Sequence, residues 1–413
     1  MKNYLLRSLL ILSTFFCYQA LAQGELSVVY AYGHENKKAV LGNILEEFGK
    51  RHSLAIKSEF LDQGDLKTDI LRMKELNTLP DAIILPADHL GLHSFIQYSK
   101  VDPTSFQANI PERIWGSGMS DGDVYGAPFI QGNHLMLYYN KSLVAEPAPN
   151  WQTLINQSAD LTKKGVATIA WSYDEAFWFL PFLGAFGGWP LHDGKIELNS
   201  PAMIAALDLY KELLNKKLPT ALCSHQCIRD NFTTGKVAYI ISGEWEGVDF
   251  YSKLGAHLGV SAIPAAVDKK MISAFSTYVI AYPNNSLNSD KKAQLVQLTN
   301  YLQSAEVQIR MWDEVGAIPV EATAFTNAQQ TGKEYLRNTL NLMQDTKPLP
   351  ADSAMSFIWD PIQKGLLRHR DTKMSSKDTA AYMQLLAERN ITKAQAQIDK
   401  CDPNTGKNCV QAQ

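Results

Sequence analysis

Short apolar runs alternate with amphipathic stretches over the first part of the chain. Residues 26–32, 54–60 and 81–85 are runs that predict buried strands. Between them, Leu41, Ile44, Leu45 and Phe48 recur at helical spacing, and residues 70–73 belong to a second amphipathic stretch that Pro80 terminates. The pattern predicts a β-α-β-α-β unit, which is typical of a parallel sheet covered by helices.

The rhythm changes near residue 125 and an α/β alternation then resumes. We predict a helix over 204–214, a buried strand over 235–241 and an amphipathic helix over 378–398. Two long extended segments, 127–139 and 273–282, are expected to be strands that cross between two lobes. The fold class expected is therefore α/β, in two lobes.

The N-terminus has the features of a cleavable export signal. Lys2 and Arg7 precede an apolar stretch over 9–16, and Ala20-Leu21-Ala22 supplies small residues before a cut after Ala22. The apolar stretch is shorter than the ~20 residues that a membrane-spanning helix requires. Cys17 leaves a lipoprotein as an alternative, although the residues before it are not small. Residues 1–22 are thus predicted to be a signal peptide.

Composition removes several classes of function. The chain has 413 residues, 46% of them apolar and 20% charged, with a net charge of −3, which is typical of a globular protein without affinity for nucleic acid. It contains no P-loop, no Gly-x-Gly-x-x-Gly turn and no Gly-x-Ser-x-Gly elbow. We expect no cofactor, no resident metal and no enzymatic activity.

Four cysteines follow the signal segment. Cys223 and Cys227 form one close pair, and Cys401 and Cys409 bracket a turn sequence. Two local disulfides are the simplest pairing, and an oxidising compartment permits them. The alternative for the first pair is a metal site that includes His225.

Other groups of polar residues allow alternative functions. His89 and His93 are spaced i, i+4, so a helix would place both on one face, where they could bind a metal. The alternative is that the segment is simply the start of a helix that Asp88 caps. Glu244 and Glu246 flank Trp245. The two acids could be the catalytic pair of a glycosidase, or, as the simpler alternative, solvent-exposed surface residues.

Aromatic residues recur beside acids in four segments. Tyr32 lies near Glu35, Trp171 and Trp178 surround Glu175, Trp245 lies between two glutamates, and Trp359 precedes an aspartate. Aromatic faces stack on the C–H faces of sugar rings, while buried sugar hydroxyls require polar partners. The recurrence of ring and acid favours a sugar-binding site over a set of core residues.

A series of short motifs in a fixed order resembles one known family. The chain resembles the periplasmic solute-binding proteins of sugar ABC transporters, most closely the maltose/maltodextrin-binding branch, from about residue 25 to about 395. The motifs are Leu79-Pro80-Asp81, Tyr125-Gly126-Ala127-Pro128, Tyr138-Tyr139-Asn140-Lys141, Pro149-Asn150-Trp151, Gly187-Gly188-Trp189, the run from Phe232 to Trp245, and Gly316-Ala317-Ile318-Pro319.

The resemblance implies a two-lobed (type II) periplasmic-binding fold, in which each lobe is a mixed sheet flanked by helices. A hinge of crossing strands joins the lobes and lets them close on a sugar. It divides the chain into a signal peptide (1–22), an N-terminal lobe (23–131 plus 280–325) and a C-terminal lobe (132–279 plus 326–413). It also implies a periplasmic monomer that delivers an oligosaccharide to membrane permease subunits. Whether a chemoreceptor is a further partner stays open at this point. The alternatives are a different solute, such as a polyamine, metal chelate or organic anion, and a secreted carbohydrate-active enzyme.

The resemblance assigns ligand-binding roles residue by residue. The matching positions are Glu35, Asp88, Glu175, Phe177, Trp245 and Trp359. A second set, where this chain differs from the family or lies beside a matched position, consists of His34, Asn36, His89 and Asn133. Leu85 replaces a tryptophan, and the acid expected in the first crossing strand is replaced by Gly132 or Asn133. The stacking residues of the second lobe are better kept than the polar contacts of the first.

Overall fold

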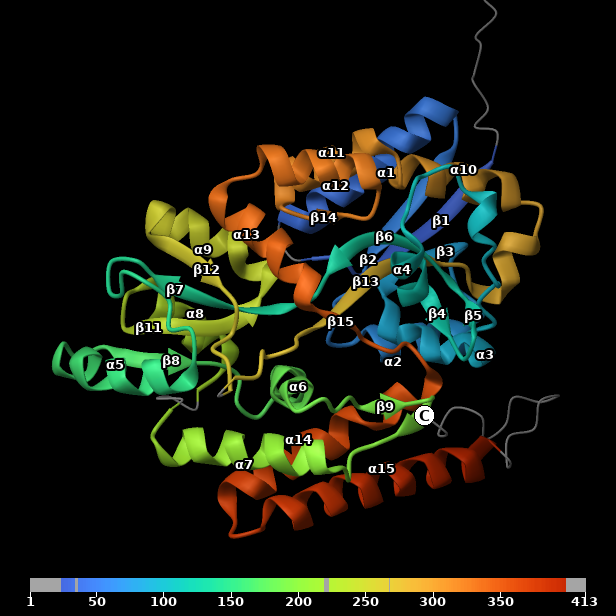
Figure 1. The fold of residues 1–413 in the computed structure, drawn as a ribbon. Coiled ribbons are helices and arrows are strands. Elements are labelled where there is room, and N and C mark those ends of the chain that lie inside the picture. Colours follow the sequence, from blue (N-terminus) through green and yellow to red (C-terminus); the bar gives the residue numbers. More distant parts are fainter. Residues whose placement is uncertain (1–23, 34–35, 219–222, 267, 399–413) are drawn as a thin grey trace, which may run out of the picture.

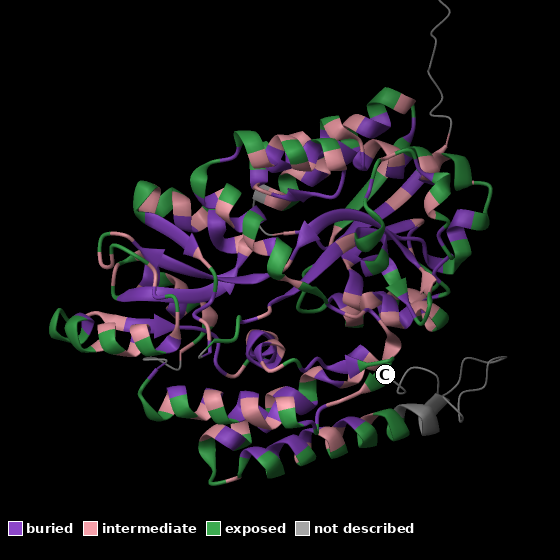
Figure 2. Cartoon of the chain, viewed as in Figure 1, coloured by how far each residue is buried: buried purple, intermediate pink, exposed green. Residues whose placement is uncertain are grey.

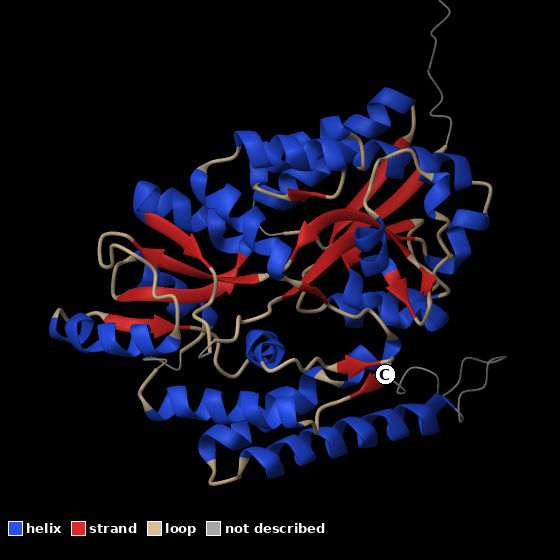
Figure 3. Ribbon diagram, viewed as in Figure 1, coloured by secondary structure: helices blue, strands red, loops and turns tan. Residues whose placement is uncertain are grey.

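The chain forms two lobes, each built around a β-sheet with helices on both of its faces (Figures 1 and 3). The computed structural model describes residues 24–33, 36–218, 223–266 and 268–398. The predicted signal peptide and the pair Cys401 and Cys409 therefore lie outside the described residues. None of the helices in the described part combines the length and the apolar character needed to cross a membrane.

The first lobe contains a seven-stranded sheet. Its path runs β14-β6-β13-β3-β1-β2, and β15 pairs with β13. Strand β1 is parallel to β2 and β3, whereas β13 is antiparallel to β3 and β6. The strands are β1 (Glu25–Tyr30), β2 (Ala55–Phe60), β3 (Ala82–Pro86), β6 (Gly126–Gly132), β13 (Ala274–Ala281), β14 (Ile318–Pro319) and β15 (Lys347–Pro348).

Helices cover both faces of this sheet because its central strands are apolar on both sides. Consecutive residues such as Val28 and Val29 point to opposite faces and enter two separate clusters of buried side chains. One face packs on α1 (Asn36–His52), α10 (Lys292–Leu302) and α11 (Ala305–Val315), and the other on α2 (Leu66–Glu75). The predicted β-α-β-α-β unit is confirmed, as β1, α1, β2, α2 and β3.

The second lobe contains a four-stranded sheet in the order β12-β7-β11-β8. Its strands are β7 (Leu135–Asn140), β8 (Ala167–Ala170), β11 (Val237–Gly243) and β12 (Leu258–Ser261). One face packs on α5 (Trp151–Lys163), α6 (Ala176–Ala185), α7 (Pro201–Asn215), α14 (Trp359–Asp371) and α15 (Ser376–Ile398). The other packs on α8 (His225–Thr233), α9 (Gly247–Leu254) and α13 (Glu334–Leu342). The predicted helices over 204–214 and 378–398 are confirmed as α7 and α15.

Smaller elements complete the two lobes. Residues of both sheets are mostly buried, while exposed residues are concentrated on the outer faces of the helices (Figure 2). The remaining helices are α3 (His93–Ile96), α4 (Glu112–Trp115) and α12 (Ala322–Thr331), and the short strands are β4 (Met119–Ser120), β5 (Asp123–Val124), β9 (Leu191–His192) and β10 (Lys195–Ile196). Two 3-10 helices matter for the site, η1 (Ala87–Leu92) and η4 (Glu244–Glu246).

The chain passes from the first sheet to the second between β6 and β7. Gly132 has φ +149° and Asn133 has φ +53°, a left-handed conformation that glycine and asparagine adopt more readily than other residues. The predicted extended segments are confirmed as strands β6, β7 and β13. Strand β13 pairs over its whole length with strands of the first sheet. The chain therefore returns to the first sheet before residue 274, whereas the prediction assigns residues up to 279 to the C-terminal lobe. The lobe boundaries themselves stay a prediction.

Candidate functional site

A cleft of about 370 Å³ is lined by residues of both lobes. The first sheet and its loops contribute polar side chains, and the second lobe contributes most of the aromatic rings. The lining consists of Gln63, Pro86, Asp88, His89, Asn133, Glu175, Ala176, Phe177, Trp178, Trp245, Ser276, Thr277, Tyr278, Trp359 and Gln363.

Seven of the ten residues predicted from the resemblance meet at this cleft. They are Asp88, His89, Asn133, Glu175, Phe177, Trp245 and Trp359. His34 and Glu35 lie outside the described residues, and Asn36 is described only as the first residue of α1. The structure thus brings together side chains from segments more than 250 positions apart in sequence, such as Asp88 and Trp359. Their ligand-binding role stays a prediction.

The aromatic residues form a connected group in the second lobe. The ring centre of Phe177 lies 6.4 Å from that of Trp245 and 6.3 Å from that of Trp359. Trp178 packs edge-to-face on Trp245 at 6.2 Å, and its indole N–H donates to the carbonyl oxygen of Ile241. Since these rings pack on the core of the second lobe, their orientation is fixed by the fold. We call Phe177, Trp178, Trp245 and Trp359 the aromatic platform.

Two local features hold the platform. Helix α6 begins directly after Glu175, and seven of its ten residues are buried, so its first turn carries Phe177 and Trp178 to the cleft. Trp245 lies against the backbone at Gly243, where a Cβ atom would come within 2.0 Å of the indole ring. Glycine at position 243 is therefore needed for the ring to lie where it does.

Most of the polar residues that line the cleft belong to the first lobe. Asp88 and His89 lie in η1, which directly follows β3. The side-chain N–H of Gln63 donates to the Tyr278 hydroxyl and, at 3.0 Å, to the carbonyl oxygen of Ala31. Tyr278 in turn packs edge-to-face on Tyr32, with ring centres 4.9 Å apart.

The expectation that His89 and His93 share one helix face is wrong. The segment is a 3-10 helix followed by the short helix α3. Asp88 lies inside the first turn of the 3-10 helix, whose N-cap is Pro86, so it does not occupy the capping position. His93 stacks on Tyr125 and contacts Asp121, with Nε2 and Oδ2 3.0 Å apart, whereas His89 lines the cleft. Among the described residues, no group of three or more His, Cys, Asp or Glu side chains has the geometry to hold a metal ion.

The acids beside Trp245 are not the surface residues that the sequence suggests. Glu246 is buried and lies 2.8 Å from the Arg229 guanidinium, and burial raises the pKa of this carboxyl to about 7. Burial also raises the pKa of the Glu244 carboxyl, whereas the positive charge of Lys37 lowers it. Neither glutamate lines the cleft.

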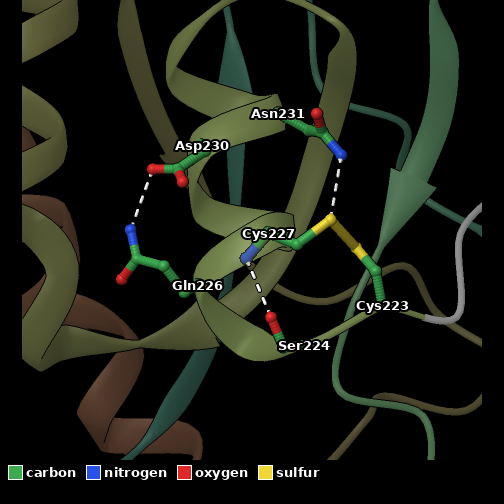
Figure 4. The surroundings of a disulfide bond; sticks show 6 residues. All are labelled: Cys223, Ser224, Gln226, Cys227, Asp230 and Asn231. Atoms are coloured by element: carbon green, nitrogen blue, oxygen red, sulfur yellow. Dashed lines mark hydrogen bonds between the residues drawn. A yellow bond between two sulfur atoms is a disulfide. The ribbon is translucent and has the colours of Figure 1, made fainter.

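A disulfide joins Cys223 and Cys227 at the start of α8 (Figure 4). The predicted first pairing is confirmed, and a metal site at this pair is not formed. Ser224 caps the helix by accepting a hydrogen bond from the backbone N–H of Cys227. The enclosed His225 packs edge-to-face on Trp178 at 5.4 Å, so the disulfide loop supports the aromatic platform from behind.

Sequence reasoning missed several lining residues. Gln63, Tyr278 and Gln363 line the cleft but belong to neither predicted set. Gln363 lies one helical turn after Trp359 on α14, a spacing that would have identified it. Trp171, by contrast, is fully buried and donates to the Tyr210 hydroxyl, so it belongs to the core.

The geometry is suited to holding a neutral polar ligand by stacking and hydrogen bonding. Rings face a cleft that also presents carboxylates and amides from both lobes, which defines a two-lobed solute-binding protein. Residues 43–338 match the family of bacterial extracellular solute-binding proteins, and the chain belongs to this family.

Curated relatives match along most of the chain. A maltooligosaccharide ABC transporter solute-binding lipoprotein of Streptococcus pneumoniae is 24% identical over 386 residues, covering 87% of this chain and 88% of the relative. A galactooligosaccharide-binding protein of Bacillus subtilis is 22% identical and covers 82% of this chain and 84% of its own.

Solved structures share the fold. The GacH receptor of Streptomyces glaucescens, solved unliganded and with acarbose, superposes with a TM-score of 0.78 at 19% identity, covering 89% of this chain and 98% of that chain. The maltose/maltodextrin-binding domain MalE of Bdellovibrio bacteriovorus, bound to maltotriose, gives 0.77 at 22% identity, covering 89% and 100%. The two-lobed fold class predicted from the sequence is confirmed.

Proposed function

We propose that this chain is the substrate-binding component of an ABC importer and captures an oligosaccharide of the maltodextrin type in the cleft. The observation that carries the proposal is the meeting of the aromatic platform with the polar side chains of the first lobe. The names of the relatives, which include maltooligosaccharide- and galactooligosaccharide-binding proteins, support the ligand class.

The proposed mechanism is capture and release of an unchanged ligand. A sugar that stacks on the aromatic platform and bonds to Asp88 and Gln63 contacts both lobes only when they close, so binding favours the closed form. The closed protein then docks on membrane permease subunits as a monomer. We propose export through the segment 1–22, with cleavage after Ala22, to the periplasm.

Charge at the cleft favours a second candidate ligand class over organic anions. Among the described lining residues, Asp88 and Glu175 are acidic and none is Lys or Arg. A polyamine would pair with these carboxylates and contact the rings through cation–π interactions. An organic anion would lack a cationic partner at this lining.

Thermal unfolding of the mature protein with separate ligands tests these alternatives. A ligand at 100 times its dissociation constant stabilises a protein by about 2.7 kcal/mol, which raises the midpoint by a few degrees. We expect a rise with maltotriose or a galacto-oligosaccharide and none with spermidine. A rise with spermidine alone would overturn the sugar proposal, and chromatography of the recovered sugar would reveal any hydrolysis by an enzyme.

A further inference from the structure

Two 3-10 helices pack directly on each other beside the cleft. Helix η1 holds Asp88 of the first lobe, and η8 (Ser353–Phe357) ends two residues before Trp359 of the aromatic platform. A Cβ atom on Gly91 of η1 would come within 3.0 Å of the backbone of Ser353, so a glycine at position 91 allows the two backbones to approach closely. The packing of η1 on η8 therefore helps to set where Trp359 lies relative to the first lobe.

The segment that leads to Trp359 passes from one lobe to the other. Strand β15 pairs with β13 of the first sheet, and Ala351 is buried in a core cluster of the first lobe. Met355 and Ile358, by contrast, are buried in the core of the second lobe. The chain therefore changes lobes at residues 352–353, and a contact made there acts on the start of α14 and on its first residue, Trp359.

A β-hairpin of the first lobe reaches this crossing point. Strands β4 and β5 are joined by Asp121 and Gly122, whose φ angles of +48° and +91° are those of a two-residue Asp-Gly turn. The backbone N–H of Asp121 donates to the Asp352 carboxylate at 3.2 Å, and Oδ1 of Asp121 accepts from the backbone N–H of Ser353 at 3.4 Å. We call these two reciprocal bonds of Asp121, with Asp352 and Ser353, the crossing clasp.

The second oxygen of the Asp121 carboxylate is held by His93. Oδ2 lies 3.0 Å from Nε2 of His93, and the imidazole stacks on Tyr125 with ring centres 4.2 Å apart. The two contacts together fix the orientation of the carboxylate. Both of its partners are attached to the site, because His93 directly follows η1 and Ser353 is the first residue of η8.

We propose that Asp121 is a positioning residue and that the crossing clasp holds Trp359 in the orientation in which it meets the ligand. Asp121 does not line the cleft, so it acts through the segment that it holds. Without the clasp, part of the order of this segment would have to be gained when the ligand binds, and that ordering costs affinity. The effect on affinity rests on the proposed function, whereas the effect on the order of residues 353–358 does not.

Substitution by glycine tests the clasp because glycine removes the carboxylate and tolerates the left-handed backbone at position 121. Asp121→Gly should weaken maltotriose binding about fivefold in calorimetry, as expected for the loss of one hydrogen bond. In the ligand-free protein it should speed amide hydrogen exchange over residues 353–358 by a similar factor. Asp352→Ala removes the other acceptor and should give the same result.

Two variants separate the carboxylate from the turn that carries it. Asp121→Asn keeps an acceptor oxygen and should remain close to the wild type in both measurements. Asp193 has the same φ of +48° in the Asp-Gly turn between β9 and β10, but its side chain is 90% exposed. Asp193→Gly is therefore the matched control and should change neither affinity nor exchange.

A double-mutant cycle shows whether the clasp acts through Trp359. Asp121→Gly should have almost no further effect on affinity in a Trp359→Ala background, but its full effect in a Trp245→Ala background. Equal losses in the two backgrounds, unchanged exchange in Asp121→Gly, or an equal effect of Asp193→Gly would overturn the proposal. If the wild type binds no oligosaccharide, the proposed function fails instead, and exchange over residues 353–358 still decides whether the clasp orders this segment.

Discussion

The two sides of the cleft are built in different ways. The second lobe presents rings that pack on one another and on a buried core, with an indole N–H bonded to the backbone. The first lobe presents single polar side chains from a 3-10 helix, a loop and a strand. The contrast suggests that the second lobe provides a rigid surface of fixed shape, while the first lobe selects among ligands by their polar groups.

The largest effect is expected on the rigid side. Trp245→Ala removes a central ring of the aromatic platform and should weaken maltotriose binding by about 2 kcal/mol, roughly thirtyfold. Trp245→Phe keeps a stacking face and should lose less. Calorimetry is the measurement, with Tyr382→Ala on the distant helix α15 as the control. Wild-type affinity in Trp245→Ala would contradict a role for the platform in binding.

A smaller effect is expected on the polar side. Asp88→Asn keeps the size of the side chain and an acceptor oxygen but removes the charge, so maltotriose binding should weaken about tenfold, or ~1.4 kcal/mol. Asp65→Asn, an exposed aspartate of the same lobe that makes no capping bond, is the matched control. If Asp88→Asn abolished spermidine binding and left sugar binding unchanged, the acid would be a charge partner of a polyamine instead.

The smallest change in affinity is expected from the disulfide behind the platform. Replacing Cys223 and Cys227 by serine should lower the free energy of unfolding by about 2 kcal/mol, because the unfolded chain gains freedom. Maltotriose affinity should fall less than about threefold, since Trp178 keeps its bond to the backbone of Ile241. Chemical unfolding and calorimetry give the two quantities. A larger loss of affinity than of stability would show that the rigidity of the platform depends on this loop.

The sequence predicts the second lobe's side of the site better than the first lobe's. The family resemblance assigns Phe177, Trp245 and Trp359 position by position, and the structure places all three at the cleft. Tyr278 lies inside a strand that reads as core, and the pairing register shifts between Tyr278 and Val279, so simple alternation along the strand does not predict its orientation. Gln63 depends on the approach of a loop to β13, which only the folded chain defines.

The fold was more predictable than the site because periodic burial is encoded locally. Helix α1 and strands β1 to β3 follow from the spacing of apolar residues alone. His89 and His93 show the limit of such reasoning, since the i, i+4 spacing implies one helix face only if the backbone is α-helical. The segment is a 3-10 helix at His89, so the two side chains lie in different surroundings.

The contact between Gly243 and the Trp245 indole has a consequence for inheritance of the binding phenotype. Residue 243 does not line the cleft, yet a side chain of any size there would displace the ring that does. A genetic selection for loss of uptake should therefore recover substitutions at codon 243 beside those at codon 245. Evolution of a new ligand preference in descendants of this gene would therefore be constrained at position 243, a residue that does not line the cleft.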